Sequence, residues 1–362
     1  QRPEWNDANN ALVGNGVSVV TLSYLRRLLA FTQSSVWPSL GNAPVSVSAT
    51  VATLAQNVQE TLIRHRGALD KKEFTNESRR SLVDELSIAG ADYRSQLYTS
   101  NLGSTTWVEP ESLVSLFATA LEFVDHSLRA NRRPDHLFHA YNLLQFQDNP
   151  VAIELHRLPL MLEGQVAALS SGLLSSAEAV ELLRAMRGSD IFRADLHTYI
   201  LYPDRQLPGF LARNIIPDPA WSSCSIFESM LNRGDHRLVD RDESGQARFN
   251  ADLIDGEALE RIIAELANDD TWAKTIATDA DQVRAVYEQV FNHRTFTGRS
   301  GGMFGFEGLG CVYWHMVAKL LLAVQENVLM AQANESPEVD ALVACYYDVR
   351  SGLGFNHTPA DF

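Results

Sequence analysis

Hydrophobic positions recur at helical spacing along most of the chain. Between residues 109 and 130, Leu113, Phe117, Leu121 and Val124 fall on one face, and Pro110 occupies the first turn. The same pattern predicts helices at 17–33, 46–66, 75–100, 109–130, 158–174, 176–187, 255–268, 279–293, 307–333 and 337–351. Only two short runs, 45–47 and 198–202, have the composition of strands.

This pattern predicts an all-α fold of roughly ten to twelve helices in antiparallel pairs. We expect an α/α toroid, a helical barrel of antiparallel helix pairs, in a single domain over residues 1–362. A helical solenoid is the alternative, but the sequence has no fixed-period repeat, which disfavours the common solenoid families.

Four connections are unusually long: 1–16, 131–157, 202–220 and 294–306. Connections beyond about 12–15 residues in a compact domain are usually functional or disordered. Because these four are rich in Trp, Tyr, His, Arg and Asn, we expect them to carry function. The charge-dense part of 220–250 is expected to lie on the surface.

The stretch 297–329 joins a glycine-rich loop to an apolar helix. Six glycines surround one carboxylate, Glu307, and the helix that follows is apolar on almost every side, which is typical of a buried helix. Glu307 would be favoured at the helix N-terminus by the helix dipole. It is interpreted either as a capping carboxylate or as part of an active-site loop.

Charge and cysteine content exclude several classes of protein. The net charge is −15 without any basic stripe, which argues against nucleic-acid binding. His315 and Lys319 interrupt the most apolar run before it reaches the roughly 18 residues of a membrane helix. Three widely spaced cysteines without a CxxC pair indicate neither a disulfide framework nor a zinc site.

These features, together with a polar start that lacks a signal-peptide pattern, favour a reducing, cytoplasmic compartment. The first residue is Gln1 rather than Met, and we therefore expect a processed chain or a segment of a longer one.

The run EWNDANN, residues 4–10, gathers two carboxylates, three amides and a tryptophan. Glu4 and Asp7 could act as general acid and base, the amides of Asn6, Asn9 and Asn10 could bind hydroxyls, and Trp5 could stack on a sugar ring. The alternative is an Asx-rich turn before a helix.

This run resembles the DWNDGMN-type motif of cellobiose-phosphorylase-like glycoside phosphorylases, whose catalytic domain is an (α/α)6 barrel. The resemblance implies that Asp7 is the general acid on the glycosidic oxygen. Glu4 and Ala8 depart from the motif, which has Asp and Gly there, and the motif stands at the start of this chain rather than inside the barrel. The chain as a whole also resembles segments of large, uncharacterised bacterial proteins of carbohydrate-enzyme character.

The glycine loop offers a second half for such a site. Successive backbone N–H groups can hold an anion, and Arg299 could assist, which suits inorganic phosphate as a co-substrate. No other cofactor is expected. A hydrolase that inverts would instead need a carboxylate base about 6.5–9.5 Å from the acid, for which Glu307 is the first candidate and Glu163 the second.

Two further loops hold candidate substrate contacts. One carries His139, Tyr141 and Asn142, and the other carries Tyr202 and Arg205. His136 and His139 have a spacing that could serve a metal on a helix, but hydrogen bonding to a polar substrate, or ordinary aromatic packing, is the simpler interpretation, and we expect no metal site. The sequence has no GxSxG elbow for a serine nucleophile.

The function that these patterns favour is cleavage or phosphorolysis of a β-linked glucan or oligosaccharide by general acid catalysis with inversion. A helical scaffold, or a domain that binds a glycan or a protein within a larger assembly, is the alternative. We expect neither a membrane nor a nucleic acid as a partner. We do expect other domains of a longer chain as partners.

Overall fold

A computed structural model describes residues 16–41, 43–99, 104–203, 208–291 and 312–355. These residues divide into two compact units: a large unit, which holds the described residues up to 203 together with 312–355, and a small unit, 208–291. The hydrophobic pattern alone had suggested one domain. The division follows from the packing, because each unit has a hydrophobic core of its own.

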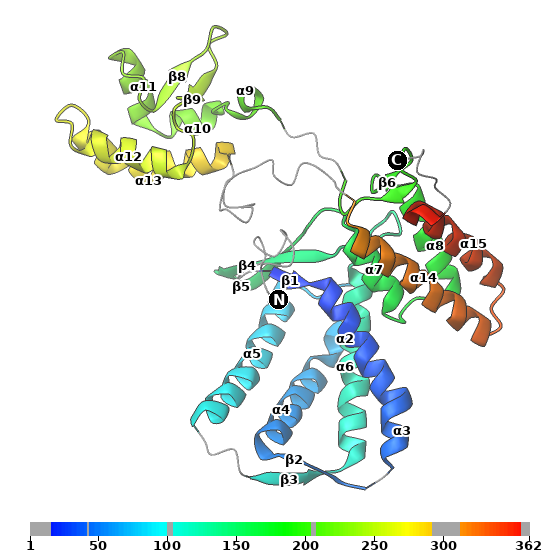
Figure 1. The fold of residues 1–362 in the computed structure, drawn as a ribbon. Helices are drawn as coiled ribbons and strands as arrows, with labels where there is room; N and C mark the ends of the chain where they lie inside the picture. The colour runs from blue at the N-terminus through cyan, green and yellow to red at the C-terminus, as the bar shows by residue number, and fades with distance from the viewer. Residues whose placement is uncertain (1–15, 42, 100–103, 204–207, 292–311, 356–362) are drawn as a thin grey trace. The chain divides into compact units, whose positions relative to one another are not determined.

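The all-α expectation is wrong. The described residues contain four small antiparallel sheets beside the helices, and they do not show a toroid (Figure 1). The largest departure is at 131–157, expected as a loop, which forms the hairpin β4 (Tyr141–Asp148) and β5 (Val151–Arg157). Alternating pairs such as Leu144 with Leu155 and Phe146 with Ile153 stabilise it.

In the large unit, β1 (Gly16–Ser18) completes a sheet of order β1-β4-β5. Helix α2 (Val19–Phe31) begins directly after β1, where the Ser18 hydroxyl accepts the Thr21 N–H at 3.0 Å and caps the helix. A π-helical turn, Thr32–Val36, leads to α3 (Trp37–Leu40).

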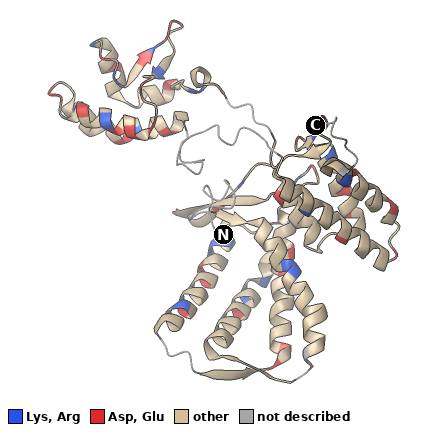
Figure 2. Cartoon of the chain, in the orientation of Figure 1, with Lys and Arg blue, Asp and Glu red and all other residues tan. Residues whose placement is uncertain are grey.

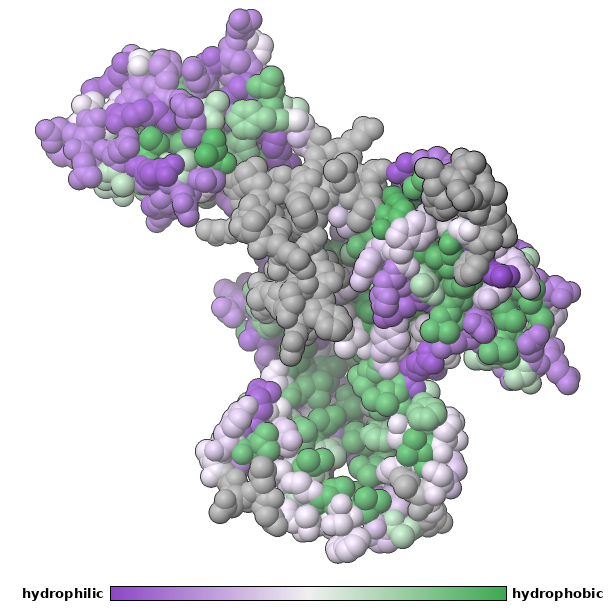
Figure 3. Space-filling model, viewed as in Figure 1, coloured by the Kyte–Doolittle hydropathy of each residue, from purple (hydrophilic) through white to green (hydrophobic). Residues whose placement is uncertain are grey.

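Three long helices follow: α4 (Ala49–His65), α5 (Asn76–Thr99) and α6 (Pro110–Ala130), with a 3-10 turn at Arg66–Asp70. Strands β2 (Val45–Ser48) and β3 (Thr105–Val108) form a two-stranded ribbon at the far end of α4 and α6 from the β1-β4-β5 sheet (Figure 1). The core among these helices is small, centred on Leu62, Leu116 and Phe123. Figure 3 shows hydrophobic side chains gathered over a hollowed face of this region.

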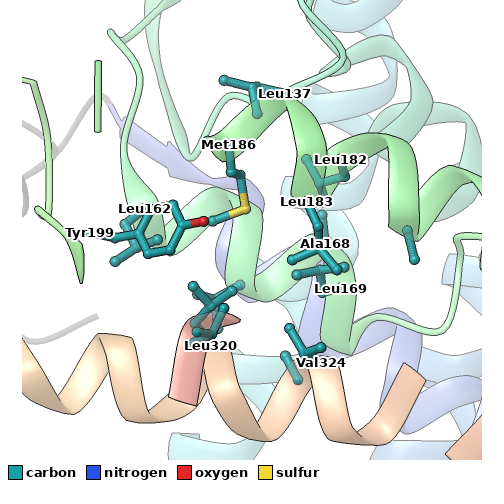
Figure 4. Close-up of a cluster of buried hydrophobic side chains, with 14 of the residues drawn as sticks. Leu137, Leu162, Ala168, Leu169, Leu182, Leu183, Met186, Tyr199, Leu320 and Val324 are labelled. Carbon is teal, nitrogen blue, oxygen red and sulfur yellow. The ribbon is translucent and has the colours of Figure 1, made fainter. Parts of the chain in front are cut away.

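The main core of the large unit lies among four other helices. They are α7 (Leu162–Ser170), α8 (Ser176–Arg187), α14 (Trp314–Ala333) and α15 (Val339–Arg350). Figure 4 shows Leu169 of α7 next to Val324 of α14, with Leu183 of α8 and Leu320 of α14 in the same cluster. The short strands β6 (Phe192–Arg193) and β7 (Thr198–Tyr199), and a π-helical turn at Ser351–Phe355, close the unit.

The apolar helix predicted at 307–333 is α14 over its described part, but only one side of it is buried. Leu320 and Val324 have no exposed surface, whereas Leu322 and Leu329 are more than half exposed. The described helix that is buried on every side is α7, in which every residue from Leu162 to Leu169 is buried.

The small unit starts with three short helices, α9 (Phe210–Arg213), α10 (Asp218–Ser222) and α11 (Ser225–Asn232). The hairpin of β8 (Val239–Arg241) and β9 (Ala247–Phe249) follows, and then the helix pair α12 (Gly256–Ala267) and α13 (Ala273–Phe291). Phe227, Met230 and Leu238 are fully buried here. The charge-dense part of 220–250 has its charged side chains exposed or half-buried, as expected, and Asp240, Arg241 and Glu243 are exposed, while apolar residues between them such as Leu238 belong to the core.

Candidate functional site around Glu163

The described residues include only part of the predicted site. Five candidates lie in the large unit, namely His139, Tyr141, Asn142, Glu163 and Tyr202. The other candidates lie outside the described residues: Glu4, Trp5, Asn6, Asp7, Asn9, Asn10, Arg205, Arg299 and Glu307.

The start of α7 is held tightly against residues 138–141. The buried Gln165 side chain accepts the N–H of Phe138 at 2.8 Å and donates to the C=O of Phe138 at 2.8 Å, as a neighbouring strand would. Gly164 packs onto the backbone of Ala140, where an added Cβ would lie only 3.1 Å from three atoms of that residue. These contacts fix the position of Glu163, which directly precedes Gly164 and Gln165 in α7.

Glu163 is a buried carboxylate, with 7% of its surface exposed. The hydroxyl of Tyr141, itself 2% exposed, donates a hydrogen bond to Glu163 Oε2. Glu163 lies in the first turn of α7, where unpaired backbone N–H groups and the helix dipole favour a negative charge. A buried carboxylate held in this way can accept hydrogen bonds from substrate hydroxyls, or take a proton.

Tyr202 and Tyr24 belong to the same neighbourhood. The N–H of Leu162 donates to the C=O of Leu201 at 2.8 Å, which places the backbone of Tyr202 one residue from this contact. Burial raises the pKa of the Tyr24 phenol, while a hydrogen bond with Ser170 and the charge of Arg27 lower it, and the charges of Glu326 and Glu163 raise it. Tyr24 was not among the predicted site residues, because its helical spacing assigned it to a packing face.

His139 and Asn142 are close in sequence but serve the framework. His139 Nδ1 lies 3.0 Å from the C=O of Leu158, and burial lowers the pKa of the ring. Asn142 alternates with Tyr141 along β4, so its side chain projects from the other face of the strand and donates to Asn131 Oδ1 at 2.9 Å. Asn142 Oδ1 is buried, and no group of the described residues donates a hydrogen bond to it.

Across the described ranges, no three His, Cys, Asp or Glu side chains are grouped closely enough to hold a metal ion. No helix in the described part of the chain is long and apolar enough to cross a membrane. The described part of the candidate site is the pair of a buried carboxylate, Glu163, and a phenol, Tyr141, both of which can hydrogen-bond a polar, uncharged ligand.

One comparison with known proteins identifies part of the chain. Residues 207–294 match the family model of GH149 phosphorylase insertion domain 2. The match coincides closely with the small unit and relates the protein to the glycoside phosphorylases. No curated protein matches the chain.

Proposed function

We propose that the protein is a glycoside phosphorylase that cleaves a β-linked glucan or oligosaccharide with inorganic phosphate. The observation that carries the proposal is the match of residues 207–294 to a phosphorylase insertion domain. The motif at 4–10 supports it independently, because the two stretches are far apart in sequence and both resemble phosphorylases. The β-linked glucan or oligosaccharide as substrate rests on the sequence motif alone.

In the proposed reaction, the Asp7 carboxyl group donates its proton to the glycosidic oxygen as the bond to the anomeric carbon breaks. Phosphate attacks that carbon from the opposite face, so the configuration inverts and the products are a sugar 1-phosphate and a shortened glycan. Trp5, Asn6, Asn9 and Asn10 would position the sugar, and Arg299 with the glycine loop would seat the phosphate.

Glu163 has a different role in phosphorolysis from the one it would have in hydrolysis. Phosphate is already an anionic nucleophile, so no protein carboxylate is needed to deprotonate it, whereas water would need Glu307 or Glu163 as a base. We assign Glu163 to substrate binding: its carboxylate, oriented by Tyr141, accepts a hydrogen bond from a sugar hydroxyl.

A panel of β-glucans and oligosaccharides, incubated with and without phosphate, tests the proposal. We expect sugar 1-phosphate to form only when phosphate is present. Asp7→Asn should reduce turnover by roughly 10²–10⁴-fold, the usual contribution of general acid catalysis. Asp252→Asn is the matched control, because Asp252 is an exposed carboxylate of the small unit. Full activity of Asp7→Asn would refute the assignment.

The alternative is a non-catalytic domain that binds a glycan or a protein. The match to an insertion domain, rather than to a catalytic domain, favours it. Binding of the same oligosaccharides in calorimetry, without turnover under any phosphate condition, would select this alternative.

A further inference from the structure

The ribbon of β2 and β3 is an isolated pair of strands. The strands are antiparallel, with Val45 opposite Val108 and Ser48 opposite Thr105. Among the described residues no third strand pairs with either of them. A two-stranded ribbon is only marginally stable in water, and further pairing or packing on its surface stabilises it.

One hydrogen bond shows which N–H and C=O groups of β3 point toward β2 and which point away from it. The N–H of Ala49 donates to the C=O of Ser104 at 3.0 Å, one step beyond the end of the ribbon. Residues opposite each other in an antiparallel pair alternate between hydrogen-bonded and non-hydrogen-bonded. Thr105 and Trp107 therefore direct their N–H and C=O groups away from β2, and no described residue bonds to these groups.

The outer edge of β3 is short, but its four residues include no charge, proline or bulge, and Glu109 and Pro110 follow only after Val108. Edge strands of monomeric proteins are protected by charged side chains, proline or bulges. Residues 105–108 read TTWV and β2 reads VSVS, without a charge or a proline, and Figure 2 shows both strands in tan. Trp107 is 71% exposed. In a chain of net charge −15, this edge is neutral.

We propose that this edge joins two copies of the chain: β3 pairs antiparallel with β3 of the second copy, about a twofold axis at Thr106. Thr105 then lies opposite the partner's Trp107, and each such pair exchanges two backbone hydrogen bonds. The result is a four-stranded antiparallel sheet in which each tryptophan packs beside a β-branched threonine, a favourable cross-strand pair.

Charge and symmetry identify the occupant as a second copy. The exposed donors and acceptors are arranged symmetrically about Thr106, so the edge is complementary to itself. Two strongly acidic chains repel each other, and an uncharged edge lets them meet without like charges directly opposite. A basic partner would find no carboxylate within β2 or β3 to bind.

The first test measures the mass of the 362-residue chain by light scattering over a range of concentrations. Thr105→Pro removes only an N–H that points away from β2, so the ribbon should persist while pairing between copies is lost. We expect a wild-type dimer whose dissociation constant rises about tenfold or more in this variant, because two symmetric hydrogen bonds are lost. Tyr347→Ala, which removes an exposed aromatic residue of α15, should leave the dimer unchanged.

A cysteine pair tests the register and does not depend on tolerance of proline. Thr106 would face the partner's Thr106 as a non-hydrogen-bonded pair, with Cα atoms about 4.5 Å apart, within reach of a disulfide. Mild oxidation should convert Thr106→Cys to a covalent dimer and Thr105→Cys far more slowly, with the wild-type chain as background. A monomeric wild type, a dimer insensitive to Thr105→Pro, or equal crosslinking of the two cysteine variants would overturn the proposal.

Discussion

At the scale of single residues, the pair of Tyr141 and Glu163 combines two buried polar side chains that have little access to water. A buried carboxylate is costly unless hydrogen bonds replace its hydration. The Tyr141 hydroxyl supplies one of these bonds, and the position of Glu163 in the first turn of α7 adds a favourable dipole. The pair therefore affects stability as well as any chemistry at the site.

Tyr141→Phe should lower the free energy of unfolding by about 1.5–3 kcal/mol, the range for a hydrogen bond to a charged group. The ring and its packing are kept, so the loss reports the hydroxyl alone. Urea denaturation followed by circular dichroism measures it. Tyr199→Phe is the control: Tyr199 is equally buried, and its hydroxyl forms no hydrogen bond within the described residues. Equal losses in the two variants would contradict the prediction.

Glu163→Gln separates phosphorolysis from hydrolysis. Gln keeps the size of the side chain and can still bind a hydroxyl, but it cannot act as a base. If Glu163 binds substrate, the variant should raise KM severalfold and change kcat little. If Glu163 were the base of a hydrolase, kcat would fall by roughly 10²–10⁴-fold. Initial rates at varied glycan concentration, at saturating phosphate, distinguish the two outcomes.

The sequence indicated Tyr141 and Glu163 separately but not their contact. Each is a residue type that binds sugars, and each lies near a predicted loop. Their contact depends on Gly164 and Gln165, which bring α7 against residues 138–141. No local pattern predicts such a tertiary approach. The converse holds for His139 and Asn142, whose residue types suited a site but whose partners are framework atoms.

At the scale of elements, the bounds of a helix were predicted correctly where the spacing of apolar residues and the capping residues indicated the same helix. Helix α8 was predicted at its observed bounds of Ser176–Arg187, and there the capping box of Ser175 and Glu178 reinforces the apolar stripe. The hairpin of β4 and β5 was missed because its period-two alternation is interrupted by pairs such as Leu143 and Leu144. The Asn149-Pro150 turn between two β-rich runs was the available signal.

Arg237 links two turns of the small unit. Its guanidinium donates to Asp235 Oδ2 at 2.6 Å and to Asp269 Oδ2 at 2.8 Å, and Trp272 Nε1 donates to Asp235 Oδ2 at 2.8 Å. The hydrogen bonds from Arg237 are the largest cause that lowers the pKa of each carboxyl group. The turn before β8 is thereby joined to the turn between α12 and α13.

This arrangement predicts a loss of stability in acid. A carboxyl group whose pKa is lowered by folding stabilises the fold above its unfolded pKa, near 4, and that contribution disappears as the pH falls through the lower folded value. Arg237→Gln should therefore lower the melting temperature at pH 7, by a few degrees, and have much less effect near pH 2. Calorimetry at both pH values measures it. An effect that is the same at both would show that Arg237 acts through packing alone.

At the scale of the whole molecule, each of the two described units has a main hydrophobic core of its own. The core of the small unit includes residues from Ile216 to Phe291, and all of them lie within the stretch that matches the insertion domain. Its arginines also find their carboxylate partners locally. The ion pairs of Arg237, Arg248 and Arg284 are all formed with residues of the small unit. A unit inserted in a longer chain can fold on its own when its core and its ion pairs are local.

We therefore expect residues 208–291, produced alone, to fold cooperatively. A unit of this size should have a free energy of unfolding of roughly 4–12 kcal/mol. Circular dichroism should show helix, and urea unfolding should give a single transition that coincides with one transition of the full chain. Phe227→Ala, which removes a fully buried ring, is the internal check and should lower stability by about 3–5 kcal/mol in the fragment and in that transition alike. A fragment without a cooperative transition, or a full chain in which Phe227→Ala shifts every transition equally, would show that the two units depend on each other to fold.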